Sequence, residues 1–123
     1  MILVDTSVWV EHLHSGNEDL AALLNGGEVL AHPFVIGELA LGNLRPREPF
    51  LSDLRDLPQA IVAKDEEVLR MINRQALFGR GIGYVDAHLL AAARLTADSK
   101  LWTRDRRLQA VAVELGLAAT LSR

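Results

Sequence analysis

The stretch GIGYVDAHLLAAARLTADSKLWTRD, residues 81–105, decides the fold of this chain. A glycine-rich loop leads into a helical pattern whose first turn carries Asp86, and the small residues 91–93 allow that helix to pack closely against a neighbour. A short apolar strand is predicted at residues 101–103, and Asp105 then begins the next helix. The order of helix, strand and helix therefore predicts an α/β protein, with two carboxylates placed beside helix N-termini.

Short apolar runs recur between helical patterns along the rest of the chain. They lie at residues 2–4, 29–31, 60–63, 101–103 and 118–121. Because these runs are apolar at nearly every position, they are typical of strands covered on both faces. Their alternation with helices predicts an α/β fold with a five-stranded, mainly parallel sheet and helices on both faces. The 123 residues fit one domain, so we predict a single domain over residues 1–123.

The composition limits where the protein can work. There are no cysteines, which excludes a disulfide framework and a thiolate metal site and suits the reducing cytosol. The opening residues lack a basic region and meet an acid at Asp5, so no signal peptide is predicted. No apolar stretch is long enough to span a bilayer. We therefore expect a cytoplasmic protein that is not associated with a membrane.

The net charge of −3 argues against a protein that holds nucleic acid by bulk electrostatics alone. Nevertheless, Arg104, Arg106 and Arg107 crowd beside Asp105. Two of these arginines fall in a predicted first helical turn, where the helix dipole disfavours a cation by about 0.3–1 kcal/mol. Local rules are often broken at functional sites, so a role in ligand binding is one interpretation. A solvated basic face without a partner is the alternative for each arginine.

Glu38 is the only polar side chain in the segment FVIGELALG, residues 34–42. Pro33 favours a helix start just before it, and a helix that is apolar all round is normally buried. A buried carboxylate is costly unless a cation, hydrogen-bond donors or a proton meet it. The pattern therefore makes Glu38 a candidate for a metal-binding or catalytic role. A salt bridge, or a rim position in water, is the alternative.

Four carboxylates are predicted to meet at one edge of the sheet. Asp5 follows the first strand and Asp105 follows the fourth, while Glu38 and Asp86 lie on helices that such a sheet can bring to the same edge. Ligands of open parallel sheets bind outside the carboxyl ends of the strands. Each aspartate alone can be explained as a helix cap, but Glu38 cannot. Four converging carboxylates could not all stay ionised without a cation, and oxygen ligands favour Mg²⁺ or Mn²⁺.

The histidines do not suggest a zinc site. Their spacings match no recognised ligand motif, so we expect surface or core roles for His12, His14, His32 and His88.

Four motifs together resemble the PIN-domain ribonucleases, and in particular the VapC toxins of bacterial VapBC toxin-antitoxin pairs. They are Asp5-Thr6-Ser7 after the opening strand, Glu38 in its apolar helix, Asp86 with three alanines behind it, and Thr103-Arg104-Asp105. The resemblance covers nearly the whole chain, and the four motifs occur in the family's order and spacing.

The resemblance implies a toxin that is a metal-dependent endoribonuclease cleaving RNA phosphodiesters. It implies that Asp5, Glu38, Asp86 and Asp105 form the catalytic site, with Mg²⁺ or Mn²⁺ bound by Asp5 and Asp86. Hydroxyl groups of Thr6, Ser7 and Thr103 would support these acids. It also implies a cognate antitoxin protein as partner, an RNA substrate and a homodimer.

Two other functions are compatible with the same residues. A partner-binding or regulatory α/β module whose acids only cap helices would be indifferent to metal. A phosphotransfer domain with Asp5 as acceptor would form a phosphoaspartate. A short amphipathic helix carrying Phe50, Leu54 and Leu57 is a candidate contact for a protein partner, with ordinary core packing as its alternative.

Overall fold

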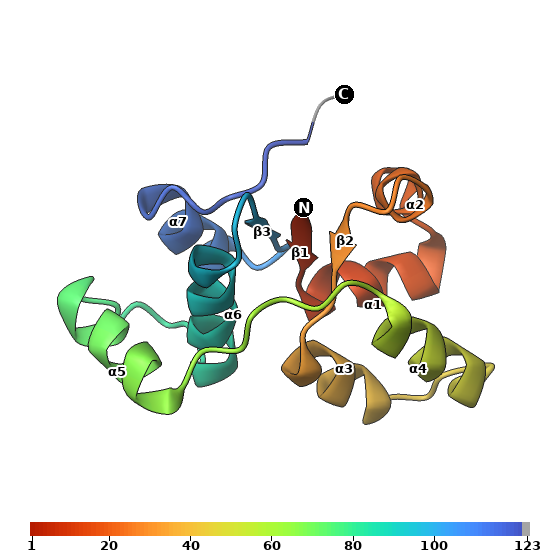
Figure 1. The fold of residues 1–123 in the computed structure, drawn as a ribbon, viewed down its shortest axis with the longest axis horizontal. Coiled ribbons are helices and arrows are strands. Elements are labelled where there is room, and N and C mark those ends of the chain that lie inside the picture. Colours follow the sequence, from red (N-terminus) through yellow and green to blue (C-terminus); the bar gives the residue numbers. More distant parts are fainter. Residues whose placement is uncertain (122–123) are drawn as a thin grey trace.

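The computed structural model describes residues 1–121 as a small parallel sheet surrounded by helices (Figure 1). In chain order the elements are β1 Ile2–Val4, α1 Thr6–Ser15, α2 Glu18–Asn25, β2 Val29–Leu30, α3 Pro33–Ala40, α4 Arg47–Asp56, α5 Asp65–Arg74, α6 Tyr84–Leu95, β3 Lys100–Trp102 and α7 Arg106–Glu114. No helix within this part of the chain is both long and apolar enough to cross a membrane.

The sheet has the strand order β2-β1-β3, and both pairings are parallel. β1 lies in the middle, so its backbone bonds to a neighbour on each side. Leu3 and Val4 point to opposite faces, as successive strand residues do, and both are 0% exposed. Both faces of the central strand are therefore covered, which agrees with the predicted α/β fold.

The prediction of five strands is wrong. The segments predicted at 60–63 and 118–121 each reduce to one isolated parallel bridge, Ala31 with Gln59 and Leu101 with Ala118. Beyond the first bridge, the Ile61 N–H donates to Thr96 Oγ1 at 2.8 Å instead of to a neighbouring strand. Ile61 and Val62 are 52% and 45% exposed. The apolar run there reflects a surface connection that leaves the sheet after one bridge.

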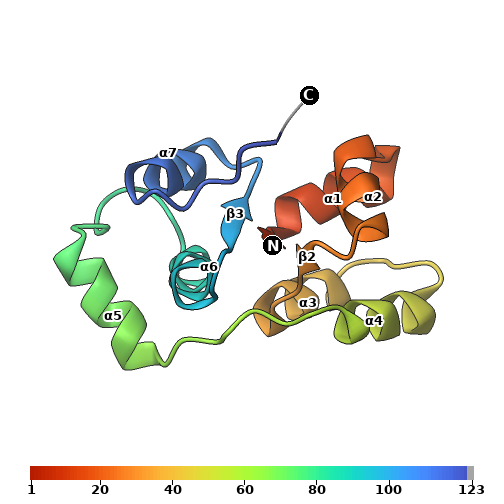
Figure 2. The same ribbon diagram turned by 45° about the horizontal axis from the view of Figure 1, so that its top comes forward.

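The helices form two groups. In both views α5, α6 and α7 gather on the β3 side of the sheet, while α1 to α4 lie on the β2 side (Figures 1 and 2). Helix α6 packs directly on β3 and on α5, and α3 packs on α1 and α4. The three alanines of α6, residues 91–93, are at most 5% exposed, which confirms their predicted role in close packing.

Helix α4 belongs to the core rather than to a free surface. Leu54 is 2% exposed, and Phe50 packs edge to face on Trp9 with ring centroids 6.1 Å apart. The interpretation of this helix as a partner contact is therefore wrong, and the core-packing alternative holds. A charged residue at position 54 would disrupt folding rather than test binding.

Candidate active site

Asp5 lies at the carboxyl end of the central strand and is 6% exposed. It occupies the N-cap position of α1, but its side chain makes no capping hydrogen bond. Instead, Oδ2 accepts hydrogen bonds from Ser7 Oγ and Thr103 Oγ1, each at 2.7 Å. These donors supply the partners that a buried carboxylate requires. The helix-cap interpretation therefore fails for Asp5, and the hydroxyls lie where the resemblance places supports.

Glu38 is exposed, so the expectation that it is buried is wrong. Helix α3 packs through Val35 and Leu39, which lie one turn apart and are 1% and 3% exposed, and this turns Glu38 away from the core. Its Oε1 accepts a hydrogen bond from Thr6 Oγ1 at 2.6 Å. The alternative interpretation, a rim position in water, is correct. It places the Glu38 carboxylate beside Thr6, the residue that follows Asp5.

Asp86 and Asp105 both contact helix N-termini. Asp86 lies in the first turn of α6, where Oδ2 accepts from the Gly83 N–H at 2.9 Å. Asp105 is the N-cap of α7, and its Oδ1 accepts from two backbone N–H groups of the first turn. Its own N–H donates to Thr103 Oγ1 at 3.1 Å. One hydroxyl therefore connects Asp105 to Asp5, and the capping interpretation is confirmed for Asp105.

The electrostatics of Asp86 indicate that the other three acids lie near it. Burial is the largest cause that raises the pKa of Asp86 above its ordinary value, and the hydrogen bond from Gly83 opposes it. The negative charges of Asp5, Asp105 and Glu38 raise the pKa further. Such effects require short separations, because charges far apart near the surface are screened. The structure thus brings the four predicted acids to one edge of the sheet.

Two of the neighbouring arginines make close contacts in the structure. Arg104 Nε lies 3.0 Å from Glu11 Oε2. The Arg107 side chain passes over Gly81, where an added Cβ would lie only 2.6 Å from its Nη1. Gly81 also has a φ of +80°, which favours glycine. The glycine of the loop therefore makes room for Arg107 beside the first turn of α6.

The acidic site fits a hard divalent cation in chemistry and in charge. Each of the four carboxylates engages one oxygen in the hydrogen bonds described above, which leaves a second oxygen for a ligand. Oxygen donors of this kind suit Mg²⁺ or Mn²⁺. A cation would relieve the repulsion between carboxylates that raises the pKa of Asp86. Within residues 1–121, however, no three acidic or histidine side chains are already arranged to hold an ion.

A cluster of aromatic side chains around two buried histidines lies on the helices that carry Glu38 and Asp86, and the sequence did not reveal it. His32 and His88 are 0% and 2% exposed, and the ring of Phe34 packs on both, with centroids 5.1 Å and 4.7 Å away. His88 Nε2 lies 3.0 Å from Asp65 Oδ1, which also accepts from the Tyr84 hydroxyl at 2.6 Å. The expected core role is confirmed for these two histidines.

The cluster connects the helices that carry two of the acids. Phe34 belongs to α3, as Glu38 does, and His88 belongs to α6, as Asp86 does. His32 Nδ1 also accepts from the Phe34 N–H at 3.0 Å and so caps α3. The signal in the sequence was a histidine immediately before the Pro33 helix start, where an N-cap is expected.

The burial of His32 predicts a pH dependence of stability. Burial, followed by the charge of His88, lowers the pKa of His32 from 6.5 to about 4. As pH falls from about 6.5 to about 4, the unfolded chain takes up this proton before the folded chain does. The free energy of unfolding should therefore fall, by at most about 1.4 kcal/mol per pH unit from this group. Denaturant titrations at several pH values measure the slope.

The variant His32→Asn isolates that slope. Asparagine is a good N-cap but cannot take up the proton. The free energy of unfolding of the variant should therefore fall less than that of the wild type over this pH range. His14→Asn, at an exposed histidine, is the matched control. Equal slopes for all three proteins would show that His32 does not resist protonation.

Comparisons with known proteins give the relationships of this chain. Residues 2–114 match the family model of the PIN domain. Two curated relatives, each named Ribonuclease VapC32 and each from a strain of Mycobacterium tuberculosis (CDC 1551 / Oshkosh and ATCC 25618 / H37Rv), are 49% identical over 118 residues, covering 96% of this chain and 95% of theirs. The crystal structure of FitAcB from Neisseria gonorrhoeae has a similar fold, with a TM-score of 0.62 and 23% identity over 92% of this chain and 94% of that one.

Proposed function

Because this chain belongs to the PIN-domain family, we propose that it is a Mg²⁺-dependent endoribonuclease and the toxin of a type II toxin-antitoxin pair. The observation that carries the proposal is that Asp5, Glu38 and Asp105 lie near enough to Asp86 for their charges to raise its pKa. The identity of 49% to relatives named Ribonuclease VapC32 supports RNA as the substrate and toxin as the role.

The residues have distinct parts in the proposed reaction. When bound, Mg²⁺ or Mn²⁺ would supply an activated water and neutralise charge on the scissile phosphate. Asp5 and Asp86 would be its ligands. Asp5 is held in place through Ser7 and Thr103, so its second oxygen has a defined position. Glu38, exposed and bonded through only one oxygen, can accept the proton of the attacking water.

The test is a divalent-ion titration of cleavage. Purified protein is incubated with several defined RNAs in EDTA, and Mg²⁺ or Mn²⁺ is then added in increasing amounts. Cleavage should be absent in EDTA and should return with either ion. Equal cleavage with and without EDTA would contradict a metal-dependent reaction, and no cleavage of any RNA would favour a partner-binding module.

Two alternatives account for less of the geometry. A module with purely capping acids explains Asp105, but it does not explain the hydroxyl pair on Asp5 or the position of Glu38. A phosphotransfer domain needs an accessible acceptor, whereas Asp5 is 6% exposed and has one oxygen engaged by two hydroxyls.

The proposal includes a protein antitoxin and a homodimer. A groove of about 310 Å³ beside Glu38 is lined by side chains of α1 and α3, among them Val10 and Leu13. Val10 and Leu13 are 53% and 46% exposed, and nearby Leu41 is 90% exposed. Exposed apolar side chains that adjoin a catalytic site suit a partner that covers both. This groove replaces α4 as the proposed partner contact.

A matched pair of substitutions tests that contact. Val10→Asp places a charge in the groove, and Val113→Asp places the same charge on α7, where valine is 59% exposed. We expect the first to weaken antitoxin binding by at least about tenfold, which is about 1.4 kcal/mol, and the second to have little effect. Titration calorimetry with the purified antitoxin measures both affinities. Similar affinities of the two variants would place the antitoxin elsewhere. Sedimentation of the wild type is a separate test of the homodimer.

A further inference from the structure

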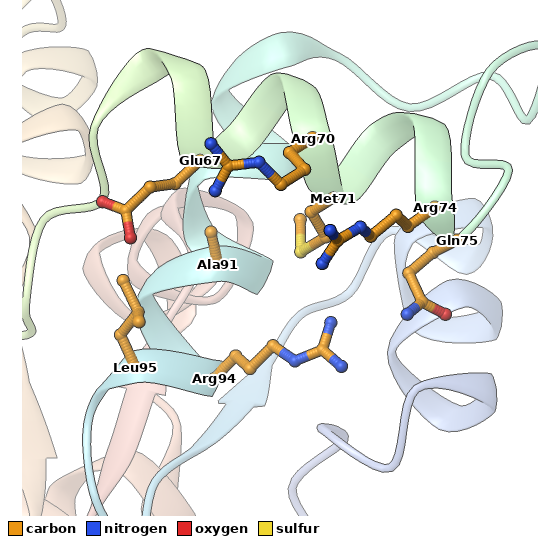
Figure 3. A pocket seen from close by; sticks show the side chains of 8 residues that line it. All are labelled: Glu67, Arg70, Met71, Arg74, Gln75, Ala91, Arg94 and Leu95. Atoms are coloured by element: carbon orange, nitrogen blue, oxygen red, sulfur yellow. The ribbon is translucent and has the colours of Figure 1, made fainter.

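A groove between α5 and α6 gathers three arginines. It holds about 360 Å³, which is in the usual range for ligand sites of about 300–1,000 Å³. Met71 and Ala91, 7% and 5% exposed, are its apolar lining residues from the core. Arg70 and Arg74 come from α5, and Arg94 comes from α6 (Figure 3). None of the four site carboxylates lines it, so it is separate from the site described above.

The three guanidinium groups lack acidic partners. No ion pair or side-chain hydrogen bond within the described residues involves any of them. Figure 3 shows Arg74 and Arg94 reaching from the two helices into the same space, while the Glu67 carboxylate projects from the far end of the groove. Glu67 Oε1 accepts from the Lys64 N–H at 2.9 Å.

The helix dipole accounts for some of these charges but not for their convergence. Arg74 and Arg94 lie in the last turns of α5 and α6, where a cation is favoured by about 0.3–1 kcal/mol. That effect applies to each helix separately. It gives no reason for two cations to share one space in a chain with more acids than bases. Of the described residues that line the groove, Glu67 alone is acidic, and its carboxylate projects from the far end. Like charges that converge repel each other, and a bound anion would offset this repulsion.

We infer that this groove binds the phosphodiester backbone of single-stranded RNA. The inference rests on the proposed function and adds a second contact for the same substrate. Guanidinium groups bind phosphate oxygens through two parallel hydrogen bonds. The helix that carries Asp86 in its first turn carries Arg94 eight residues later, about 12 Å along the axis. An RNA strand held at the groove therefore extends along α6 toward the four carboxylates.

Two double variants with equal charge changes test the inference. Arg74→Gln with Arg94→Gln removes two groove cations, and Arg45→Gln with Arg55→Gln removes two exposed cations outside it. Binding of a labelled single-stranded RNA of about 15 nucleotides is measured by anisotropy, in EDTA to prevent cleavage and over a range of salt concentrations. A DNA strand of the same sequence separates general phosphate binding from a preference for RNA.

The groove variant should bind RNA about tenfold more weakly, or about 1.4 kcal/mol. Its salt slope should be about 1.4 units smaller, since each phosphate contact on a single strand contributes about 0.7. The control should retain the wild-type slope. Arg74→Lys with Arg94→Lys keeps the charge and should restore most of the slope, which a packing role would not predict. In cleavage assays with metal, the groove variant should raise KM and leave kcat unchanged.

Other outcomes overturn the inference. If the wild type cleaves RNA and the groove variant binds it as the control does, the groove is not an RNA contact, although the proposed function stands. If the groove variant keeps its RNA affinity but loses self-association or antitoxin binding, the occupant is a protein. If the wild type neither binds nor cleaves RNA, the inference and the proposed function fail together.

Discussion

Glu38→Gln should lower RNA cleavage by at least about a hundredfold while leaving the fold intact. Loss of a single group that stabilises the transition state typically costs about 2.7–4 kcal/mol, and glutamine cannot accept the proton of the attacking water. The structure explains why the fold survives. Glu38 is exposed, and the amide oxygen of glutamine can still accept the hydrogen bond from Thr6.

Single-turnover cleavage and thermal unfolding of the same preparations measure the two effects. Glu48→Gln on α4 is the control, because it removes an exposed glutamate from a helix that carries none of the four acids. Wild-type turnover in Glu38→Gln, with contaminating nuclease excluded, would remove Glu38 from the mechanism. A large loss of thermal stability would show that the side chain is structural.

Asp86→Asn should abolish cleavage and yet raise the melting temperature in EDTA. The pKa of Asp86 is raised, so the folded chain holds this proton to higher pH than the unfolded chain does. Ionisation therefore reduces stability as pH rises from 3.8 through the raised pKa, and the cost remains at neutral pH. Asparagine removes the charge but can still accept from the Gly83 N–H. After allowance for solvent screening, we expect a gain of about 1 kcal/mol, or roughly 4 °C.

Calorimetry with and without Mg²⁺ separates repulsion from metal binding. Millimolar Mg²⁺ should raise the melting temperature of the wild type by binding the folded state. It should raise that of Asp86→Asn less, because a ligand is lost. Asp53→Asn, at an exposed position of α4, is the charge-matched control and should behave as the wild type does. If Asp86→Asn has the same melting temperature as the control, and Mg²⁺ changes the melting temperature of neither the wild type nor Asp86→Asn, the four acids do not form one metal site.

Asp5→Asn is a less direct probe of the charge in this site. The Asp5 carboxylate accepts two hydroxyl hydrogen bonds at 2.7 Å and is 6% exposed. Replacing it therefore changes a buried hydrogen-bond network as well as a charge, and the two contributions have opposite signs. Asp86, whose hydrogen bond to the backbone survives the substitution, reports the charge more directly.

The sequence by itself determined the α/β class and the order of most elements, and it singled out the four acids as candidates. Local rules suffice for these features. An apolar run such as Ile2–Val4 can form a buried strand, Pro33 and Asp105 mark helix starts, and residues 91–93 are small enough for close packing. The family resemblance added the hydroxyls at Thr6, Ser7 and Thr103, all of which contact the acids in the structure.

Only the tertiary structure decided how far the sheet extends and which side chains are covered. Residues 60–63 and Glu38 both lie in apolar segments, yet residues 61 and 62 and Glu38 are exposed. Apolar composition records how well a segment could be buried, whereas burial depends on which distant segments pack against it. The same reason applies to His32 with His88 and to Arg74 with Arg94. His32 lies at the N-cap of α3 and His88 in α6, while Arg74 and Arg94 lie in α5 and α6, so helix packing brings the members of each pair together.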